Sequence, residues 1–227
     1  MTRFRAPALA AALSLPMVVL APISSPAAAG AGPGTVTAPL SSLIAALPVH
    51  AEGSRDGYGR EQFKHWIDAD RDGCDTRAEV LLAEATVQPE VTRRCTITAN
   101  TGQWWSWYDE TTQTDKFDVD IDHMVPLGEA WDSGAAAWTA AERQAYANDL
   151  DDERSLAAVH DSTNQSKADR DPAQWMPPAA SATCRYLTDW VVVKTRWGLS
   201  VDTAELAALN RIQARCDDPV TTVTRAR

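Results

Sequence analysis

Two short stretches of the sequence carry residue types that together are suited to metal-assisted hydrolysis. Asp122 and His123 stand side by side, and Asn164 follows the histidine by 41 positions. A carboxylate and an amide supply hard oxygen ligands of the kind that Mg²⁺ prefers, and two such ligands leave most of its octahedral shell for water and phosphate. A histidine beside the metal can deprotonate an attacking water. These residues are therefore the first candidates for a catalytic site.

The same stretches resemble the motifs of a known nuclease superfamily. The runs DHMVPL and STNQSKADRDPAQW, in this order, resemble the HNH or ββα-metal nucleases. The resemblance is strongest to secreted actinobacterial HNH nucleases, whose domain is similar to the C-terminal domain of GmrSD restriction endonucleases. It implies that His123 is the general base and that Lys167 contacts phosphate. It also implies that Asp122 and Asn164 hold one divalent cation, with Mg²⁺ as the first choice and Mn²⁺ as the alternative.

One position departs from the pattern of that superfamily, in which a middle Asn ties the loop around the base at the start of the second strand. Counting back from Asn164 gives Ser155 at this place. A serine hydroxyl offers one donor, whereas an amide can make several hydrogen bonds. Asn148, at another point of the loop, is the alternative, and the sequence leaves the choice open. The resemblance extends from Tyr58 to Leu199.

The resemblance implies an α+β fold with a ββα-metal core, an antiparallel hairpin followed by a helix, surrounded by further helices. It also implies hydrolysis of DNA, with RNA as a second candidate substrate, by water that leaves a 5′-phosphate product. Arg143 and Arg60 are candidates for a phosphate clamp, although surface salt bridges are the default for such arginines. The sequence contains no helix-turn-helix, zinc finger or basic arm, so we expect backbone binding with little sequence specificity.

An acidic run offers a rival site. The residues Asp68, Asp70, Asp72 and Glu79 fit the spacing of an EF-hand calcium loop. A tight acidic turn, with Asp75 as the N-cap of the next helix, explains the same run without calcium. This run makes a secreted calcium-binding structural module the first rival function. A degenerate nuclease that binds nucleic acid without cutting it is the second.

The hydrophobic pattern predicts which elements hold these residues. Apolar residues alternate with aspartates over 117–122, which predicts a strand that pairs in a hairpin with the aromatic stretch 104–108. A second short strand is expected at 156–159, and a helix from Gln165. Helical spacing and capping residues predict further helices at 40–47, 61–66, 76–85, 127–131, 139–147, 184–197 and 206–214.

Composition and the N-terminal pattern predict an exported globular protein. Residues 1–29 have the basic start, apolar run and small-residue cleavage site of a signal peptide. Its removal leaves 19 Lys and Arg against 31 Asp and Glu, an acidic balance that argues against passive binding of nucleic acid. We expect a flexible leader at 30–38 and one nuclease domain at 39–227, acting as a monomer without a membrane anchor after cleavage.

The four cysteines are widely spaced, without any C-x-x-C pair. In an oxidising compartment such an even number favours two disulfides over a zinc site. The sequence allows three pairings. We favour Cys74 with Cys95 and Cys184 with Cys216, because these pairs close loops that coincide with apparent structural units.

Overall fold

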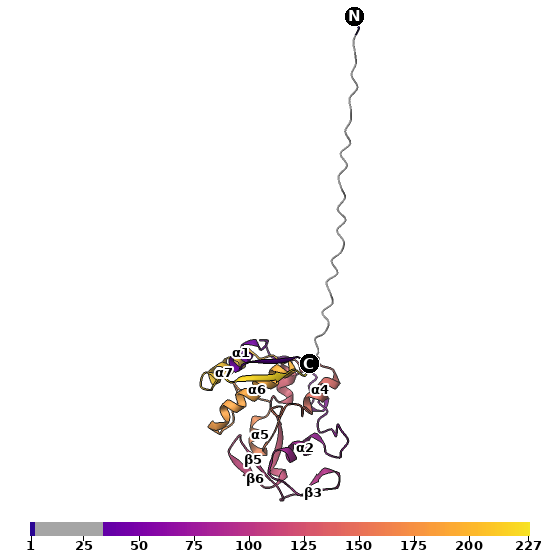
Figure 1. Cartoon of the computed structure of the whole chain (residues 1–227), viewed down its shortest axis with the longest axis vertical. Helices are drawn as coiled ribbons and strands as arrows, with labels where there is room; N and C mark the ends of the chain where they lie inside the picture. Colours follow the sequence, from indigo (N-terminus) through magenta and orange to yellow (C-terminus); the bar gives the residue numbers. More distant parts are fainter. Residues whose placement is uncertain (3–33) are drawn as a thin grey trace. The chain divides into compact units, whose positions relative to one another are not determined.

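The strand that ends at His123 pairs with a later strand that leads straight into a helix, and this antiparallel pair is called the hairpin below although two helices lie between its strands. The computed structural model describes residues 1, 2 and 34–227, so the expected signal peptide at 1–29 and residues 30–33 of the expected leader lie outside the described residues. β7 (Val119–His123) runs antiparallel to β8 (Leu156–His160), with His123 opposite Leu156. α5 (Asp161–Lys167) follows β8 directly and carries Asn164 in its middle (Figure 1).

The alternation that predicted β7 has a clear structural cause. Val119 and Ile121 point into a small core that they share with Leu156 and Ala158 of β8 and with α2 (Thr76–Ala83). Successive side chains on a strand face opposite sides, so the aspartates between them face away from this core. The hairpin therefore presents its polar side chains towards α5, which packs against both strands.

The aromatic stretch before β7 forms a different sheet from the one expected. β5 (Gln103–Ser106) pairs with β6 (Thr111–Gln113) on one side and with β2 (Ala85–Val87) on the other. β3 (Val91–Thr92) and β4 (Thr96–Ile97) form a separate two-stranded ladder. The predicted hairpin between 104–108 and 117–122 is wrong, because a tight turn at Glu110, with a φ of 56°, pairs β5 with the nearer β6.

The helices begin where their capping residues predict. The side chain of Asp75 accepts a hydrogen bond from the backbone of Ala78 at the start of α2, and Thr139 and Glu142 form a complete capping box on α4. The remaining α-helices are α1 (Leu40–Ala46), α3 (Leu127–Asp132), α4 (Ala140–Ala147), α6 (Thr183–Trp197) and α7 (Thr203–Gln213).

Short 3-10 turns connect these elements. The helix predicted at 61–66 is reduced to one of them, and Trp66 has a φ of 57°, which a right-handed helix does not allow. The 3-10 turns are η1 (Arg60–Gln62), η2 (Arg93–Cys95), η3 (Lys116–Asp118), η4 (Ala135–Ala137) and η5 (Ala180–Ala182).

The segment expected as a flexible leader is an ordered strand from Thr35 onward. β1 (Thr35–Pro39) pairs antiparallel with β9 (Val220–Thr224), and the two lie side by side in Figure 1. Val36 and Ala38 pack against the main core, and Val223 of β9 is buried in it. The ordered domain therefore starts earlier than the expected residue 39, because these apolar side chains and a distant partner strand hold the segment.

Both expected disulfides are present in the structure. Cys74 and Cys95, with Cα atoms 4.9 Å apart, join the loop before α2 to η2. Cys184 and Cys216, with Cα atoms 5.6 Å apart, join the start of α6 to the segment after α7. Each bridge thus ties a helix to a neighbouring irregular segment.

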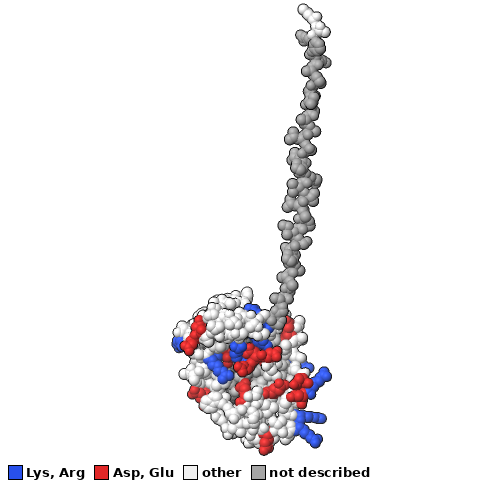
Figure 2. All heavy atoms as spheres, in the orientation of Figure 1, with Lys and Arg blue, Asp and Glu red and all other residues white. Residues whose placement is uncertain are grey.

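The face drawn in Figure 2 carries acidic side chains interspersed with lysines and arginines. No helix in the described part of the chain is long and apolar enough to cross a membrane. The main core lies beneath this polar surface and is built largely around α6, with Tyr186, Trp190 and Trp197 among its buried aromatic residues.

Candidate active site

His123 is the last residue of β7, and one of its two ring nitrogens makes a hydrogen bond to the backbone. Its Nε2 lies 3.0 Å from the carbonyl oxygen of Ala147, and a carbonyl only accepts, so the proton is on Nε2. The ring is stacked between Trp66 and Tyr146, at centroid distances of 5.6 and 6.4 Å. Burial lowers the pKa of His123 to about 3, so the imidazole is neutral near pH 7 and its Nδ1 carries a lone pair.

Asp122 is buried beside the histidine, and one of its two oxygens is occupied. Oδ2 accepts hydrogen bonds from the ammonium of Lys167 and, at 2.5 Å, from the hydroxyl of Tyr108. Burial raises the pKa of the Asp122 carboxyl, and the charge of Lys167 opposes this shift. Within the described residues Oδ1 takes no hydrogen bond, so it is the oxygen available for another partner.

Lys167 does not have the position expected of a phosphate contact. Its side chain is fully buried, and its ammonium donates to Asp122 and, at 3.1 and 2.8 Å, to the carbonyl oxygens of His123 and Met124. All three donor positions of the ammonium are thereby used. The expected direct contact with phosphate is wrong, because α5 packs this side chain inward; Lys167 instead joins α5 to the end of β7.

Asn164, in the middle of α5, lines the same cleft as Asp122 and His123. Its Nδ2 donates to Oδ2 of Asp120 at 3.2 Å, which fixes which end of the amide is the donor and which the acceptor. A cleft of about 170 Å³ brings Asn164 together with Asp122 and His123. The other residues that line this cleft are Arg60, Ile121, Pro126, Leu127, Gln165, Ala168 and Asp169.

The two candidate arginines are separated by the fold. Arg60 is exposed and lines the cleft. Arg143 lies elsewhere: its guanidinium donates to the carbonyl oxygens of Gln62, Ala135 and Trp138 at 3.4, 3.3 and 2.5 Å. The expected phosphate clamp at Arg143 is therefore wrong, because its side chain does not line the cleft and its Nε and Nη1 donors are bound to three backbone carbonyls.

Ser155 and Asn148 both make hydrogen bonds near the base, but they hold different segments of the chain. Asn148 accepts from the backbone of Ile67 at 3.1 Å and donates to the carbonyl of Lys64 at 2.7 Å, so it holds the loop that carries Trp66. It also follows Ala147, the acceptor of the His123 proton. Ser155 instead donates its hydroxyl to Asp149 at 2.8 Å. Ser155 therefore makes the single loop bond expected of its hydroxyl, to Asp149, whereas Asn148 ties the end of α4 to the segment that carries Trp66.

Several groups at or beside the cleft were not predicted from the sequence. Arg55 donates to Asp169 at 2.9 Å and to Asp132 at 2.5 Å, and so places a second guanidinium beside the cleft. Arg55 stands in an irregular segment without a motif, and the carbonyl of Ala147 is a backbone group that no residue type encodes. Asp169, in contrast, belongs to the run STNQSKADRDPAQW, so its place at the cleft could have been predicted from the sequence.

The acidic run forms a turn on the surface. Oxygen atoms of Asp68, Asp70 and Asp72 lie within 4.8 Å of one another, and all three residues are exposed. Backbone N–H groups of Asp72, Gly73 and Cys74 donate to these carboxylates. Glu79 is not part of the group of three, although their charges add to the burial that raises its pKa. Calcium binding by this turn stays a prediction.

Comparison with known proteins identifies relatives of the chain. A family model for the C-terminal domain of GmrSD restriction endonucleases matches residues 76–212. An uncharacterized secreted protein of Arthroderma benhamiae is 45% identical over 175 residues, which cover 77% of this chain and 83% of the relative. No solved structure matches. The matched segment includes β7, β8 and α5 with the whole Asp122–Asn164 region, and the chain therefore belongs to the family of the GmrSD restriction endonuclease C-terminal domain.

Proposed function

We propose that the protein is a secreted, metal-dependent endonuclease of the HNH type that hydrolyses DNA with little sequence specificity. The observation that carries the proposal is the cleft in which a neutral imidazole, His123, lies beside the oxygen atoms of Asp122 and Asn164. The strand–strand–helix order of β7, β8 and α5 supports a ββα-metal core. Family membership supports a nuclease-like activity, and the secreted relative supports export.

The residues of the cleft fit one divalent cation, Mg²⁺ first and Mn²⁺ as the alternative. Oδ1 of Asp122 and the amide oxygen of Asn164 are hard ligands, and both are free of hydrogen bonds among the described residues. Lys167 and Tyr108 hold the other oxygen of Asp122, and Asp120 turns the amide nitrogen of Asn164 away. Bound there, the cation would stabilise the negative charge that builds up on the phosphate.

In this proposal His123 is the general base. Its Nδ1 takes a proton from water, the water oxygen forms a bond to phosphorus, and the bond to the 3′ oxygen breaks, which leaves a 5′-phosphate. The 3′ oxygen leaves with the bonding electron pair and takes a proton from a solvent water, and His123 afterwards returns its proton to solvent. The hydrogen bond from Nε2 to Ala147 keeps the lone pair on Nδ1 and stabilises the ring when it becomes positively charged. Stacking between Trp66 and Tyr146 prevents the ring from rotating away.

Arg60 takes the role of phosphate contact in this proposal. It is the arginine that lines the cleft, and its exposed guanidinium has the planar fork that suits phosphate oxygens. Backbone contacts of this kind carry no base specificity. We therefore propose that DNA is cut without sequence preference, that RNA is a second substrate, and that the monomer is the active form.

The test is cleavage of supercoiled plasmid and of a mixed-sequence RNA by residues 30–227, in EDTA, Mg²⁺, Mn²⁺ or Ca²⁺. We expect metal-dependent cutting that His123→Ala abolishes. His160→Ala is the matched control, because His160 lies on β8 and pairs with Asp109 at 2.7 Å outside the cleft. No cutting by the folded protein with any metal would overturn the proposal; DNA binding under those conditions would favour the degenerate nuclease.

A further inference from the structure

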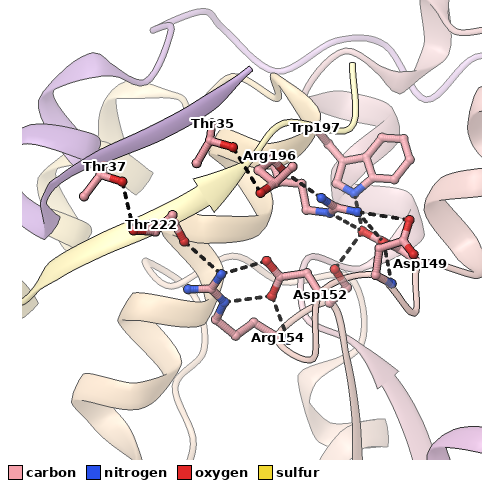
Figure 3. Close-up of polar contacts among 11 residues, drawn as sticks. Thr35, Thr37, Asp149, Asp152, Arg154, Arg196, Trp197 and Thr222 are labelled. Carbon is pink, nitrogen blue, oxygen red and sulfur yellow. Dashed lines mark hydrogen bonds and ion pairs between the residues drawn. The ribbon is translucent and has the colours of Figure 1, made fainter. Parts of the chain in front are cut away.

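A buried carboxylate just beyond the acceptor of the His123 proton is the centre of a dense polar cluster. Asp149 is 5% exposed, and its Oδ2 accepts from Ser155 Oγ at 2.8 Å, Arg196 Nε at 2.7 Å and Trp197 Nε1 at 2.8 Å. Arg196 adds a second bond from Nη2 to Oδ1 at 2.8 Å, so the pair is bidentate. Figure 3 shows Arg196 and Trp197 of α6 converging on Asp149 in the loop before β8.

The loop that Asp149 holds contacts the catalytic strand at both ends. At its start, the carbonyl of Ala147 accepts from His123 Nε2 at 3.0 Å. At its end, the carbonyl of Ser155 accepts from the backbone N–H of Met124 at 3.0 Å. Between these points the chain forms no helix or strand. Ala147 is the last residue of α4, so the position of its carbonyl relative to His123 depends on α4 and on the loop that follows, in which Asp149 is the most heavily bonded side chain.

We propose that Asp149 and Arg196 are positioning residues for the general base. This inference rests on the proposed nuclease function. The bidentate pair fixes the loop against α6, the loop fixes the Ala147 carbonyl, and the carbonyl fixes both the proton and the orientation of His123. A misplacement of this carbonyl alters the direction of the Nδ1 lone pair, and errors of about 1 Å in such groups cost up to roughly a hundredfold in rate.

The cluster extends to the C-terminal strand. Arg196 Nη1 donates to the carbonyl of Thr224 at 2.6 Å, and Arg154 Nη2 donates to the carbonyl of Thr222 at 3.1 Å, both on β9. Arg154 is itself paired in two places with Asp152, at 2.7 Å each. Two arginines thus make similar contacts with a carboxylate and with β9, but only Arg196 contacts Asp149 (Figure 3).

This similarity supplies the experiment. Arg196→Lys keeps the charge but removes the bidentate pair, and Arg154→Lys makes the same change at the arginine that does not contact Asp149. Ser155→Ala and Trp197→Phe each remove one donor to Asp149 with less risk to folding. Two quantities are measured: kcat and KM for plasmid cleavage, and the ¹⁵N spectrum of histidine-labelled protein, in which His123 is one of four histidines.

We expect Arg196→Lys to lower kcat at least about tenfold with KM within about twofold of wild type, because the loss falls on the chemical step. Its His123 signal should lose the single Nε2–H tautomer of the wild type. Ser155→Ala and Trp197→Phe should change both measurements in the same direction, and Arg154→Lys should leave both unchanged.

A folded Arg196→Lys protein with wild-type kcat and a wild-type His123 signal would overturn the positioning role. If that variant does not fold, Ser155→Ala and Trp197→Phe decide the question, and wild-type behaviour of both overturns it equally. If the wild-type protein cuts no substrate, the proposed function fails. The ¹⁵N spectra still decide whether Asp149 and Arg196 hold His123.

Discussion

A single buried lysine determines how the cleft presents its carboxylate. Asp122 is 4% exposed, and burial alone favours its neutral form. The ammonium of Lys167 lies against it and opposes that shift, so the ionised carboxylate keeps a partner inside the protein. The Nζ atom of Lys167 also lies near three aromatic rings. It is 5.8, 5.4 and 5.9 Å from the ring centroids of Tyr108, Tyr186 and Trp190. Charge and aromatic packing together hold α5 on the hairpin.

Lys167→Met tests this arrangement. The variant leaves Asp122 buried without its cation, and breaking a buried pair costs about 3–5 kcal/mol of the free energy of unfolding. Urea unfolding measures the loss. Asp122→Asn combined with Lys167→Met should recover part of it, because the unpaired charge is gone. A double variant no more stable than Lys167→Met alone would contradict the explanation.

Arg60 and Arg143 give opposite predictions. Arg60→Gln should reduce plasmid cleavage on the order of tenfold, with an unchanged midpoint of urea unfolding, because an exposed guanidinium contributes little to stability. Arg143→Gln should lower the free energy of unfolding by about 1–3 kcal/mol, because carbonyl oxygens lose their donor. Loss of stability in Arg60→Gln, or normal stability in Arg143→Gln, would reverse the assignments.

The sequence patterns correctly predicted several residues that line the cleft, but they assigned wrong roles to Lys167 and Arg143. Asp122, His123 and Asn164 meet there because the first two end β7 and the third lies on α5, which directly follows the partner strand β8. The roles of Lys167 and Arg143 depend on which side chains bury them, and those neighbours come from distant parts of the chain. No sequence pattern encodes that environment, so both were assigned to phosphate.

On the scale of elements, α2 and the hairpin meet through a buried acid. Glu84, at the end of α2, accepts a hydrogen bond from the backbone of Ala158 on β8 at 3.1 Å. Burial raises the pKa of Glu84 to about 7. Burial also raises the pKa of Glu205 to about 7 and that of Asp189 to about 6. These acids bind protons more tightly in the folded state than in the unfolded state.

The pH dependence of stability follows from that difference. Because folded Glu84 binds its proton more tightly than the unfolded chain does, its contribution to the free energy of unfolding should fall as the pH rises from about 4.5 to 7, then level off. His123, whose pKa burial lowers to about 3, contributes with the opposite sign below about pH 6.5, so the contribution of Glu84 is read from the difference between wild type and a Glu84 variant. Glu84→Gln keeps the acceptor and removes the titration, so it should flatten the fall by on the order of 2 kcal/mol. Urea unfolding at several pH values measures both proteins. If the free energy of unfolding changed with pH in the same way in both proteins, Glu84 would not be the group that titrates.

Helix starts, which neighbouring capping residues determine, were predicted correctly. The partners of the strands were not. Asp75 and the Thr139–Glu142 capping box marked helix starts correctly, since a cap needs only neighbouring residues. The partner of β7 was misassigned because alternation shows that a strand exists but does not identify its neighbour. The strand β1 was missed for the same reason: its partner, β9, lies at the other end of the domain.

On the scale of the whole molecule, β1 and β9 hold the ends of the domain together. The hydroxyls of Thr35 and Thr37 lie against those of Thr224 and Thr222, at 3.4 and 2.9 Å (Figure 3). The carbonyl of Thr224 on β9 in turn accepts from Arg196, which holds Asp149. A change in β1 is therefore expected to act on the loop before β8 through β9.

A protein that starts at Leu40 instead of Gly34 tests this connection. It lacks β1, and we expect its melting temperature to fall by about 5 °C or more, since a loss of 1 kcal/mol lowers the melting temperature of a domain of this size by about 2–4 °C. Amide hydrogen exchange should become faster in β9 and in residues 149–155, with little change in β5 and β6. Equal exchange in the two proteins would show that β1 does not support β9.

The pairing of β1 with β9 also determines when the domain can be completed during synthesis of the chain. Thr35 and Thr224 are 189 positions apart, and every residue of the cleft lies between them. A growing chain therefore contains Asp122, His123 and Asn164 before it contains the strand that receives Arg196. Contacts between such distant residues form late in folding. For the nuclease proposed here, we therefore expect cutting activity to appear only after the last strand has been made.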